Sequence, residues 1–528
     1  MANERKIAKA ASIMGFATII SRIMGYLRDA CIAYIFGATM YADAFFVAFR
    51  VSNLLRRLVG EGALTSSFIP IFTDVFAGRS KEEARDFVSG FFTLFFIILV
   101  VLAVLGMVFS RNLVVLMSPG FLAVERKFSI TVNLTRLMFP HMVFIGLMAA
   151  SMGVLHTMRH FAAPALSPVV FNISIILFAF LLSPFLGVPV YALGIGVVCG
   201  VALQFAVQVP FLKRYGMLPR IYFRWNDPAI KKILILMGPA VVGIGIYQLN
   251  VFVTTNFASR LPEGSVSYLY FGSRLMELPL GIFGVAFTHA LLPSLSEFVT
   301  KKDFSSFRDS LSFTMRTVNF VNIPATAGLI VLAPPIINIL FRRGEFGPLE
   351  ASQTAFALYF YALGIVPVAS SRILVSVFYS LKDTRTPVIG AVMSFFFNII
   401  MCIVLIKPLR HGGLALAASL SAVLDLSFLS IALRLKMGRF GARGIVFSAL
   451  KSFAAAVLMG ATLFLLTSYS GWEGFGKLHG ALFLGFSIAA GLIVYITVCR
   501  FLNAHEVVFL KEIVEGRIKR IRTKYSSN

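Results

Sequence analysis

The sequence predicts an all-α polytopic membrane protein with about fourteen transmembrane helices, arranged as two pseudo-symmetric six-helix lobes plus two C-terminal helices. Three observations support this fold class: the composition, a series of long apolar stretches and an internal repeat. Of the 528 residues, 58% are hydrophobic and only 13% are charged. Soluble globular proteins contain about 45–50% apolar and about 25% charged residues, so the composition excludes a soluble enzyme, a disordered chain and a fibre.

A helix needs about 20 apolar residues to cross a hydrocarbon core about 30 Å thick. Fourteen stretches of the chain meet this requirement. In order they are 8–35, 41–72, 87–110, 129–157, 163–187, 190–212, 233–259, 266–298, 310–340, 351–380, 387–406, 412–433, 447–469 and 478–499. We expect the first stretch to be retained, because no small-residue cleavage site of the kind that ends a signal peptide follows it.

The basic residues predict which ends of these helices face the cytoplasm. The net charge is +25, from 48 Lys+Arg against 23 Asp+Glu. With both termini on one side, that side carries 29 basic residues in its loops and tails, and the opposite side carries 9. Because cytoplasmic loops are rich in Lys and Arg, both termini are predicted to be cytoplasmic. The charge is therefore topological, and a nucleic-acid partner is not expected.

Two halves of the chain resemble each other. Residues 42–62 align with 266–286 at an offset of 224, which pairs Arg50 with Arg274, and the stretch 162–173 resembles 386–399. Parallel repeats imply a pseudo-twofold axis along the membrane normal and a site between the halves. The predicted parts follow from this repeat. They are an N-terminal lobe at 1–215, a C-terminal lobe at 216–440, two helices at 441–505 and a basic cytoplasmic tail at 506–528 that lies near an anionic leaflet.

Ten basic residues remain inside the predicted helices, where acids are fewer. A charge at mid-bilayer costs about 2.5–3.5 kcal/mol, so it persists where it meets water, a partner or a ligand. Arg22 and Arg28 lie six residues apart on the first helix, and both could border one wide cavity. The alternative is that each is neutralised by an acid, with Asp29 or Asp43 as the nearest candidates.

A second group lies on the next helix, in the stretch NLLRRLVGEG. Arg57 and Glu61 are at i and i+4 and can pair, whereas Arg56 points about 100° away and has no local acid. The pair is either a permanent internal ion pair or a gating pair that forms in one conformation. A third group lies in YFGSRLMELP, where Arg274 and Glu277 are at i and i+3. Arg274 is either salt-bridged or directed at the central axis.

Unpaired arginines converging from these helices would form a cationic chamber. Guanidinium groups bind phosphate oxygens through two parallel hydrogen bonds, so a pyrophosphate fits and a cationic drug or metal ion is repelled. Sequence motifs for zinc hydrolysis, for an ATP-binding loop and for a nucleophilic serine are absent. Without an ATP site, active transport would have to use an ion gradient, the membrane potential or the gradient of the substrate itself.

At these residues the sequence resembles the MurJ (MviN) family of bacterial lipid II flippases. The resemblance is carried by SRIMGYLRDACIAYIFG, ADAFFVAFRVSNLLRRLVGEGALTSSFIPIF, SVSYLYFGSRLMELPLGIFGVAFTHALLPSLSEF and FYSLKDTRTPV. It implies the fold of the multidrug/oligosaccharidyl-lipid/polysaccharide exporter superfamily, in which two lobes surround a cavity and the last two helices form a groove toward the lipid. It also implies a transporter of the bacterial inner membrane rather than an enzyme.

The implied activity is movement of the undecaprenyl-pyrophosphate-linked peptidoglycan precursor, lipid II, to the outer leaflet by alternating access. The resemblance places the substrate-binding arginines at Arg22, Arg28, Arg56 and Arg274. It places acids for gating or charge pairing at Asp29, Asp43 and Glu61, beside Arg57 and Glu277. The partners expected are lipid II, membrane lipids and the cell-wall synthesis machinery.

This sequence departs from some family members at two places. Ser273 stands where some members have an acid, and residues 233–259 contain no Asp or Glu for a sodium site. No cofactor or metal is expected beyond a monovalent cation, with Asn398 as the candidate sodium ligand, or the membrane potential as the driving force. The alternatives are a flippase for another polyprenyl-pyrophosphate-linked glycan, a cation-coupled drug exporter, a membrane scaffold, and an enzyme acting on lipid pyrophosphate.

Overall fold

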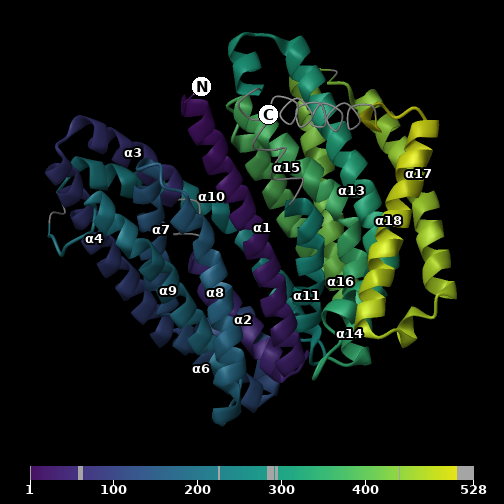
Figure 1. The fold of residues 1–528 in the computed structure, drawn as a ribbon, viewed down its shortest axis with the longest axis horizontal. Helices are drawn as coiled ribbons and strands as arrows, with labels where there is room; N and C mark the ends of the chain where they lie inside the picture. Colours follow the sequence, from purple (N-terminus) through teal and green to yellow (C-terminus); the bar gives the residue numbers. More distant parts are fainter. Residues whose placement is uncertain are drawn as a thin grey trace, which may run out of the picture. The chain divides into compact units, whose positions relative to one another are not determined.

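A computed structural model of the chain describes residues 2–56, 64–223, 226–281, 291, 295–438 and 440–507. These residues form helices and connecting turns, and the described part of the chain contains no β-strand. Two compact units are present (Figure 1). Unit 1 comprises Met1–Ser267 together with Arg343–Gly347, and unit 2 comprises Tyr268–Arg342 and Pro348–Asn528.

Unit 1 is a bundle of ten α-helices within its described residues. They are α1 (Ala2–Phe36), α2 (Met40–Arg56), α3 (Leu64–Gly78), α4 (Lys81–Val108), α5 (Ser110–Met117), α6 (Glu125–Met138), α7 (His141–Thr157), α8 (Ala162–Leu181), α9 (Tyr191–Tyr215) and α10 (Pro228–Ser259). A short 3₁₀ turn, η2 (Pro119–Ala123), precedes α6. A stack of phenylalanines on α3 and α4, with ring centroids 4.8 to 6.3 Å apart, fills part of the core.

The segment Arg343–Gly347 belongs to unit 1 although the helices on both sides of it belong to unit 2. The backbone amide of Glu345 donates a 3.0 Å hydrogen bond to the carbonyl of Tyr34 at the end of α1. Gly37 has a φ of +59°, and a Cβ added there would collide with the carbonyl of Glu345. The turn between α1 and α2 therefore needs glycine at this position both for its backbone conformation and for the contact.

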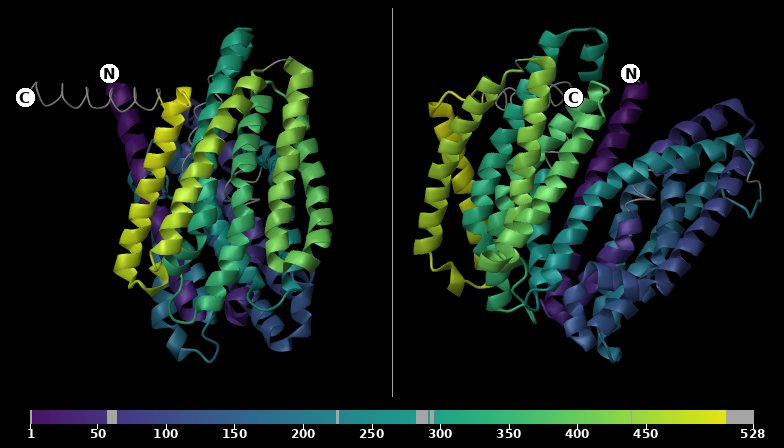
Figure 2. Two further views of the ribbon diagram at one scale, coloured as in Figure 1. Left: turned by 90° about the vertical axis from the view of Figure 1, so that its right-hand side faces the viewer. Right: turned by 180° about the vertical axis from the view of Figure 1, so that it is seen from behind.

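Seven helices with described bounds belong wholly or mainly to unit 2. They are α11 (Ser265–Pro279), whose first three residues belong to unit 1, α13 (Phe304–Leu340), α14 (Pro348–Leu363), α15 (Ile365–Ser380), α16 (Arg385–Met437), α17 (Ala442–Tyr469) and α18 (Lys477–Phe501). The last two helices lie side by side (Figures 1 and 2). Both pack against α13, where the hydroxyl of Tyr495 donates a 2.7 Å hydrogen bond to the carbonyl of Phe320.

Two of the predicted stretches differ in detail from the observed helices. The stretch 129–157 is divided at Phe139 and Pro140, where proline removes a backbone donor, and 351–380 is bent by 41° at Gly364. The stretches 387–406 and 412–433 are two helices under the single label α16, and they meet at a sharp break at Arg410 (φ 47°, ψ −128°), between the two predicted stretches.

Eight helices among the described residues are long and apolar enough to cross a membrane, or nine if the bent pair α14 and α15 counts as one span. The predicted all-α membrane fold is thus confirmed. The number fourteen and the lobe boundaries at 215 and 440 stay predictions.

Candidate functional site

Arg28 and Asp29 form a buried ion pair on α1. Both Nε and Nη2 of Arg28 donate to Oδ1 of Asp29, at 3.0 and 2.6 Å. Arg28 is 7% exposed and Asp29 is fully buried. Of the two roles that the sequence leaves open for Arg28, the structure therefore displays charge pairing, with the acid that follows it in the chain.

Arg22 lies on the same helix, six residues before Arg28, and is half-buried. No carboxylate or other hydrogen-bonding group of the described residues contacts its guanidinium. Helix α8 packs beside this part of α1, where the amide of Asn172 donates to the carbonyl of Ser21 at 3.4 Å. Within the described part of the chain, Arg22 is thus a cation beside a packed helix and without an acidic partner.

Of the two arginines in α2, the structure describes the side chain of Arg50. Arg50 donates a 2.7 Å hydrogen bond from Nη1 to Oγ1 of Thr255 and so joins α2 to α10. The side chain of Arg56, together with Arg57 and Glu61, lies outside the described residues. The predicted pairing of Arg57 with Glu61 therefore stays a prediction.

Arg274 lies on α11, in the part of that helix that belongs to unit 2. Its Nη1 donates to Oε2 of Glu277 at 3.0 Å, with side-chain exposures of 30% and 52%. An ion pair this open to solvent contributes about 1 kcal/mol or less, so Arg274 can exchange its carboxylate partner for another anion at low cost. A wide π-helical turn at Leu280 and Gly281 follows Pro279.

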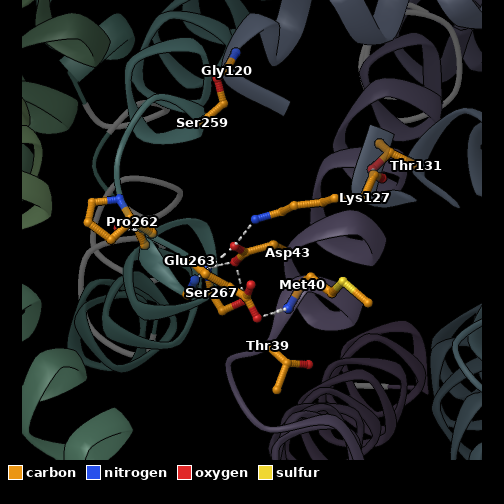
Figure 3. A network of polar contacts seen from close by, with 12 residues as sticks. Thr39, Met40, Asp43, Gly120, Lys127, Thr131, Ser259, Pro262, Glu263 and Ser267 are labelled. Atoms are coloured by element: carbon orange, nitrogen blue, oxygen red, sulfur yellow. Dashed lines mark hydrogen bonds and ion pairs between the residues drawn. The ribbon is translucent and has the colours of Figure 1, made fainter. Parts of the chain in front are cut away.

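Asp43 is the centre of a buried network between α2, α6 and the start of α11 (Figure 3). Its Oδ2 accepts from Nζ of Lys127 at 2.7 Å and from the amide of Gly264 at 2.9 Å. Its Oδ1 accepts from the amide and the hydroxyl of Ser267, at 2.9 and 2.7 Å. The partner of Asp43 among the cations is thus a lysine of α6 and not an arginine of α1.

A second acid completes this network. Oε1 of Glu263 accepts a 2.6 Å hydrogen bond from the backbone amide of Met40, the first residue of α2 (Figure 3). Helix starts leave backbone amides unpaired and carry partial positive charge, so a carboxylate stabilises them. Asp43 thus caps α11, and Glu263 caps α2.

Sequence reasoning missed Lys127, Glu263 and Thr255. The sequence predicts Lys127 to lie in a loop, because the next apolar stretch begins only at residue 129. Its burial follows from a contact with a residue 84 positions away, which no local spacing indicates. The repeat offset of 224 was a usable signal, since it aligns Asp43 with Ser267.

Asn398 is buried within α16, and its Oδ1 lies 3.8 Å from Sγ of Cys402. Near it, the hydroxyl of Ser394 donates to the carbonyl of Ser421 across the two halves of this element. Within the described ranges, no three His, Cys, Asp or Glu residues are grouped as metal ligands would be. Sodium binding at Asn398 stays a prediction.

An apolar hollow of about 580 Å³ lies in unit 2, between α13, α17 and the junction of α14 with α15. Its lining is aliphatic and aromatic apart from Thr326, and it includes Ile323, Leu363, Ala449 and Phe453. The resemblance implies a lipid groove at the last two helices. The hollow does border α17, and α13 supplies its other long wall.

The comparisons with known proteins agree with this fold. The family model described as "Lipid II flippase MurJ" matches residues 32–479. A protein of Vibrio cholerae named "Probable lipid II flippase MurJ" is 34% identical over 502 residues, which cover 94% of this chain and 96% of that protein.

Solved structures show the same similarity. One titled "Lipid II flippase MurJ, inward closed conformation" superposes with a TM-score of 0.78 at 27% identity, over 93% of this chain and 99% of that one. An inward-facing multidrug resistance MATE family transporter of the MOP superfamily shares the fold, with a TM-score of 0.64 at 13% identity, over 81% of this chain and all of that one. Because the family model covers most of the sequence, the chain belongs to the MurJ family of lipid II flippases.

Proposed function

We propose that this protein moves lipid II from the cytoplasmic to the outer leaflet of the bacterial inner membrane, and that its cavity arginines hold the pyrophosphate. The transported substrate is inferred from the name shared by the family model and the Vibrio cholerae relative. A transporter, rather than an enzyme, is what that name describes.

One observation carries the assignment of the anion site. Arg22 is a half-buried guanidinium on α1, which the sequence predicts to cross the membrane, and it has no acidic partner among the described residues. A permanent cation in such a place is costly unless a ligand or water compensates it. A pyrophosphate supplies several acceptor oxygens in the geometry that guanidinium groups prefer. Arg28, Arg56 and Arg274 complete the proposed site.

The two compact units suggest how the lipid would cross. The chain passes between them after Ser267 and on both sides of the Arg343–Gly347 segment, and each unit has its own core. We infer that the units rock against each other, with the pyrophosphate exposed to each side in turn. Transporters with this fold have been solved in structures titled inward-facing and outward-facing, which supports alternating access as the mechanism.

The rest of the substrate would be accommodated by apolar surface. The hollow beside α13 and α17 has a volume of about 580 Å³ and an almost purely hydrocarbon lining, which fits part of a polyprenyl chain.

The termini would be cytoplasmic, as the charge distribution predicts. The driving force would be a sodium gradient or the membrane potential, because a headgroup with several negative charges crosses that potential at a large energetic cost or gain. The cell-wall synthesis machinery would consume the flipped lipid.

The test is transport of fluorescent lipid II by the purified protein in liposomes, with and without a membrane potential. A charge-assisted hydrogen bond contributes about 1.5–3 kcal/mol, so Arg22→Ala should lower transport about tenfold to a hundredfold. Arg22→Lys should retain part of the activity. Arg443→Ala, which removes an exposed arginine at the start of α17, is the matched control and should be as active as the parent.

The same experiment separates the alternatives. Transport of another polyprenyl-pyrophosphate-linked glycan in place of lipid II would reassign the substrate while keeping the arginine site. Export of a cationic drug with no lipid movement would overturn the proposal. Lipid II movement that is unchanged in both Arg22 variants would refute the role of the arginine, and support of growth by a variant unable to move lipid would favour a scaffold.

A further inference from the structure

Lys127 is a buried ammonium held between an acid and an aromatic ring. It lies in the first turn of α6 and is 6% exposed. Its Nζ donates to Oδ2 of Asp43 at 2.7 Å and lies 4.2 Å from the ring centroid of Phe121, in η2. A buried ammonium is costly by itself, and here a carboxylate and the face of a ring compensate it.

The bonds to Asp43 show what this ammonium supports. An ionised carboxylate has about four acceptor positions, and four donors from Lys127, Gly264 and Ser267 occupy them. Asp43 is only 1% exposed, and Lys127 is the basic side chain bonded to it among the described residues.

Three of the four donors to Asp43 belong to the start of α11. The amides of Gly264 and Ser267 stand at the positive end of this helix, where a carboxylate is favoured. Arg274 lies seven residues beyond Ser267, about two turns or roughly 10 Å along the axis. These contacts therefore hold the first turn of the helix that carries Arg274.

We propose that Lys127 is a positioning residue of the flippase: its ammonium keeps Asp43 bonded to the first turn of α11 and so orients the helix that bears Arg274. Lys127 does not touch the substrate and acts through Asp43. The inference rests on the proposed function for the role of Arg274, whereas the link from Lys127 to the start of α11 stands on the contacts alone.

The experiment measures separately how firmly the start of α11 is held and whether lipid II transport depends on it. Cys31, Cys199, Cys402 and Cys499 are replaced by alanine, and Ser265, which is 3% exposed at the start of α11, is replaced by cysteine. The rate of maleimide labelling in detergent then reports how firmly this start is held, with no dependence on transport. Lys127→Met should raise the rate about tenfold, whereas Lys127→Arg should leave it within about threefold of the parent.

Two controls make the labelling specific. Lys232→Met removes an exposed lysine of α10 and should leave the rate unchanged. A reporter cysteine at Ser183, a buried position after α8, should stay unlabelled in Lys127→Met, which excludes general unfolding. If Lys127→Met does not fold, Asp43→Asn combined with Lys127→Met removes both charges and takes its place, with the same expected rise.

Transport in liposomes completes the test. Lys127→Met should lower lipid II transport about tenfold, and Lys127→Arg should restore most of it. Unchanged labelling at position 265 in Lys127→Met and in the double variant would overturn the inference. Labelling that rises while transport stays normal would likewise overturn it, because the start of α11 would then be irrelevant to function. If the parent itself moves no lipid II, the proposed function fails, and labelling still decides whether Lys127 holds α11.

Discussion

Asp43 and Ser267 are hydrogen bonded to each other across 224 residues of sequence, the offset at which the predicted internal repeat aligns them. Around them the starts of two repeat-related helices cap each other, since Asp43 of α2 accepts from amides of α11 and Glu263 beside α11 accepts from the amide of Met40. Each helix start thus has backbone amides bonded to a carboxylate that comes from beside the other helix. It also makes the two starts depend on each other.

Replacing Asp43 by asparagine should destabilise the protein strongly. Asparagine keeps one acceptor oxygen but leaves the buried ammonium of Lys127 without its carboxylate. Breaking a buried ion pair from one side costs about 3–5 kcal/mol. Thermal unfolding in detergent should therefore show a melting temperature several degrees below that of the parent.

Glu263→Gln is the informative comparison for this prediction. Glu263 bonds the amide of Met40 from an exposed position, and glutamine keeps an acceptor there. The loss should be about 1 kcal/mol or less. A melting temperature for Asp43→Asn as high as that of Glu263→Gln would show that the charge of Asp43 is unimportant.

The buried pair on α1 allows stability and transport to be separated. Arg28→Ala leaves Asp29 without the two hydrogen bonds from the guanidinium, so it should lower the free energy of unfolding by about 3 kcal/mol. Arg28→Ala combined with Asp29→Asn removes the stranded charge and should recover much of that loss. Both variants should fail to move lipid II if Arg28 binds pyrophosphate. Normal transport by the stable double variant would remove Arg28 from the site.

Much of the fold follows from the sequence because the solvent is a bilayer. Backbone groups in hydrocarbon must pair within the segment, so an apolar run of sufficient length forms a helix with few alternatives. The breaks within runs are harder to predict. Gly364 lies inside the predicted stretch 351–380, and its bend depends on how neighbouring helices pack, whereas the break at Arg410 falls in the predicted connection between residues 406 and 412.

In the candidate site, contacts between residues near in sequence were easier to predict than contacts between distant residues. Arg274 and Glu277 stand at i and i+3, a pair that helical spacing makes predictable. Arg28 pairs with the next residue of the chain, Asp29, which nearness in the sequence alone makes a candidate. The bond of Asp43 with Lys127 spans 84 residues and arises because α2 packs on α6. Spacing contains no information about such a contact, and the sequence alone makes Asp43 only one of two candidate partners for the arginines of α1.

Filling the apolar hollow should impair handling of the lipid tail. Ala449 lines this space on α17, and tryptophan there would occupy a substantial part of the roughly 580 Å³. Ala449→Trp should lower transport of lipid II with a full-length polyprenyl chain about tenfold, while binding of a short-chain analogue to the same protein stays unchanged.

Leu458→Trp is the matched control, because this exposed apolar residue of α17 does not line the hollow. Equal transport by the two tryptophan variants would indicate that the tail lies elsewhere.

Asp383 lies in the segment KDTRTP, which connects α15 to α16, and it contacts both ends of α16. Its carboxylate accepts from Nζ of Lys436 at 2.6 Å and from the amide and hydroxyl of Thr386 at 3.0 and 2.8 Å. The bond from Lys436 first, and those from Thr386 after it, lower the pKa of Asp383 below its ordinary value of 3.8. A carboxyl with a lowered pKa in the folded state adds stability above its unfolded pKa, and this stability is lost as the pH falls through the folded value.

Asp383→Asn keeps an acceptor for Thr386 and removes the charge facing Lys436. Because Lys436 is 43% exposed, the loss at pH 7 should be only about 0.5–1 kcal/mol. The melting temperatures of parent and variant should differ at pH 7, keep that difference down to about pH 4, and converge below it as the parent carboxylate takes up its proton. Lys436→Met should give the same difference at pH 7, and the double variant should add nothing to it. A difference that persists unchanged at pH 2 would mean that the side chain acts through packing and not through its charge.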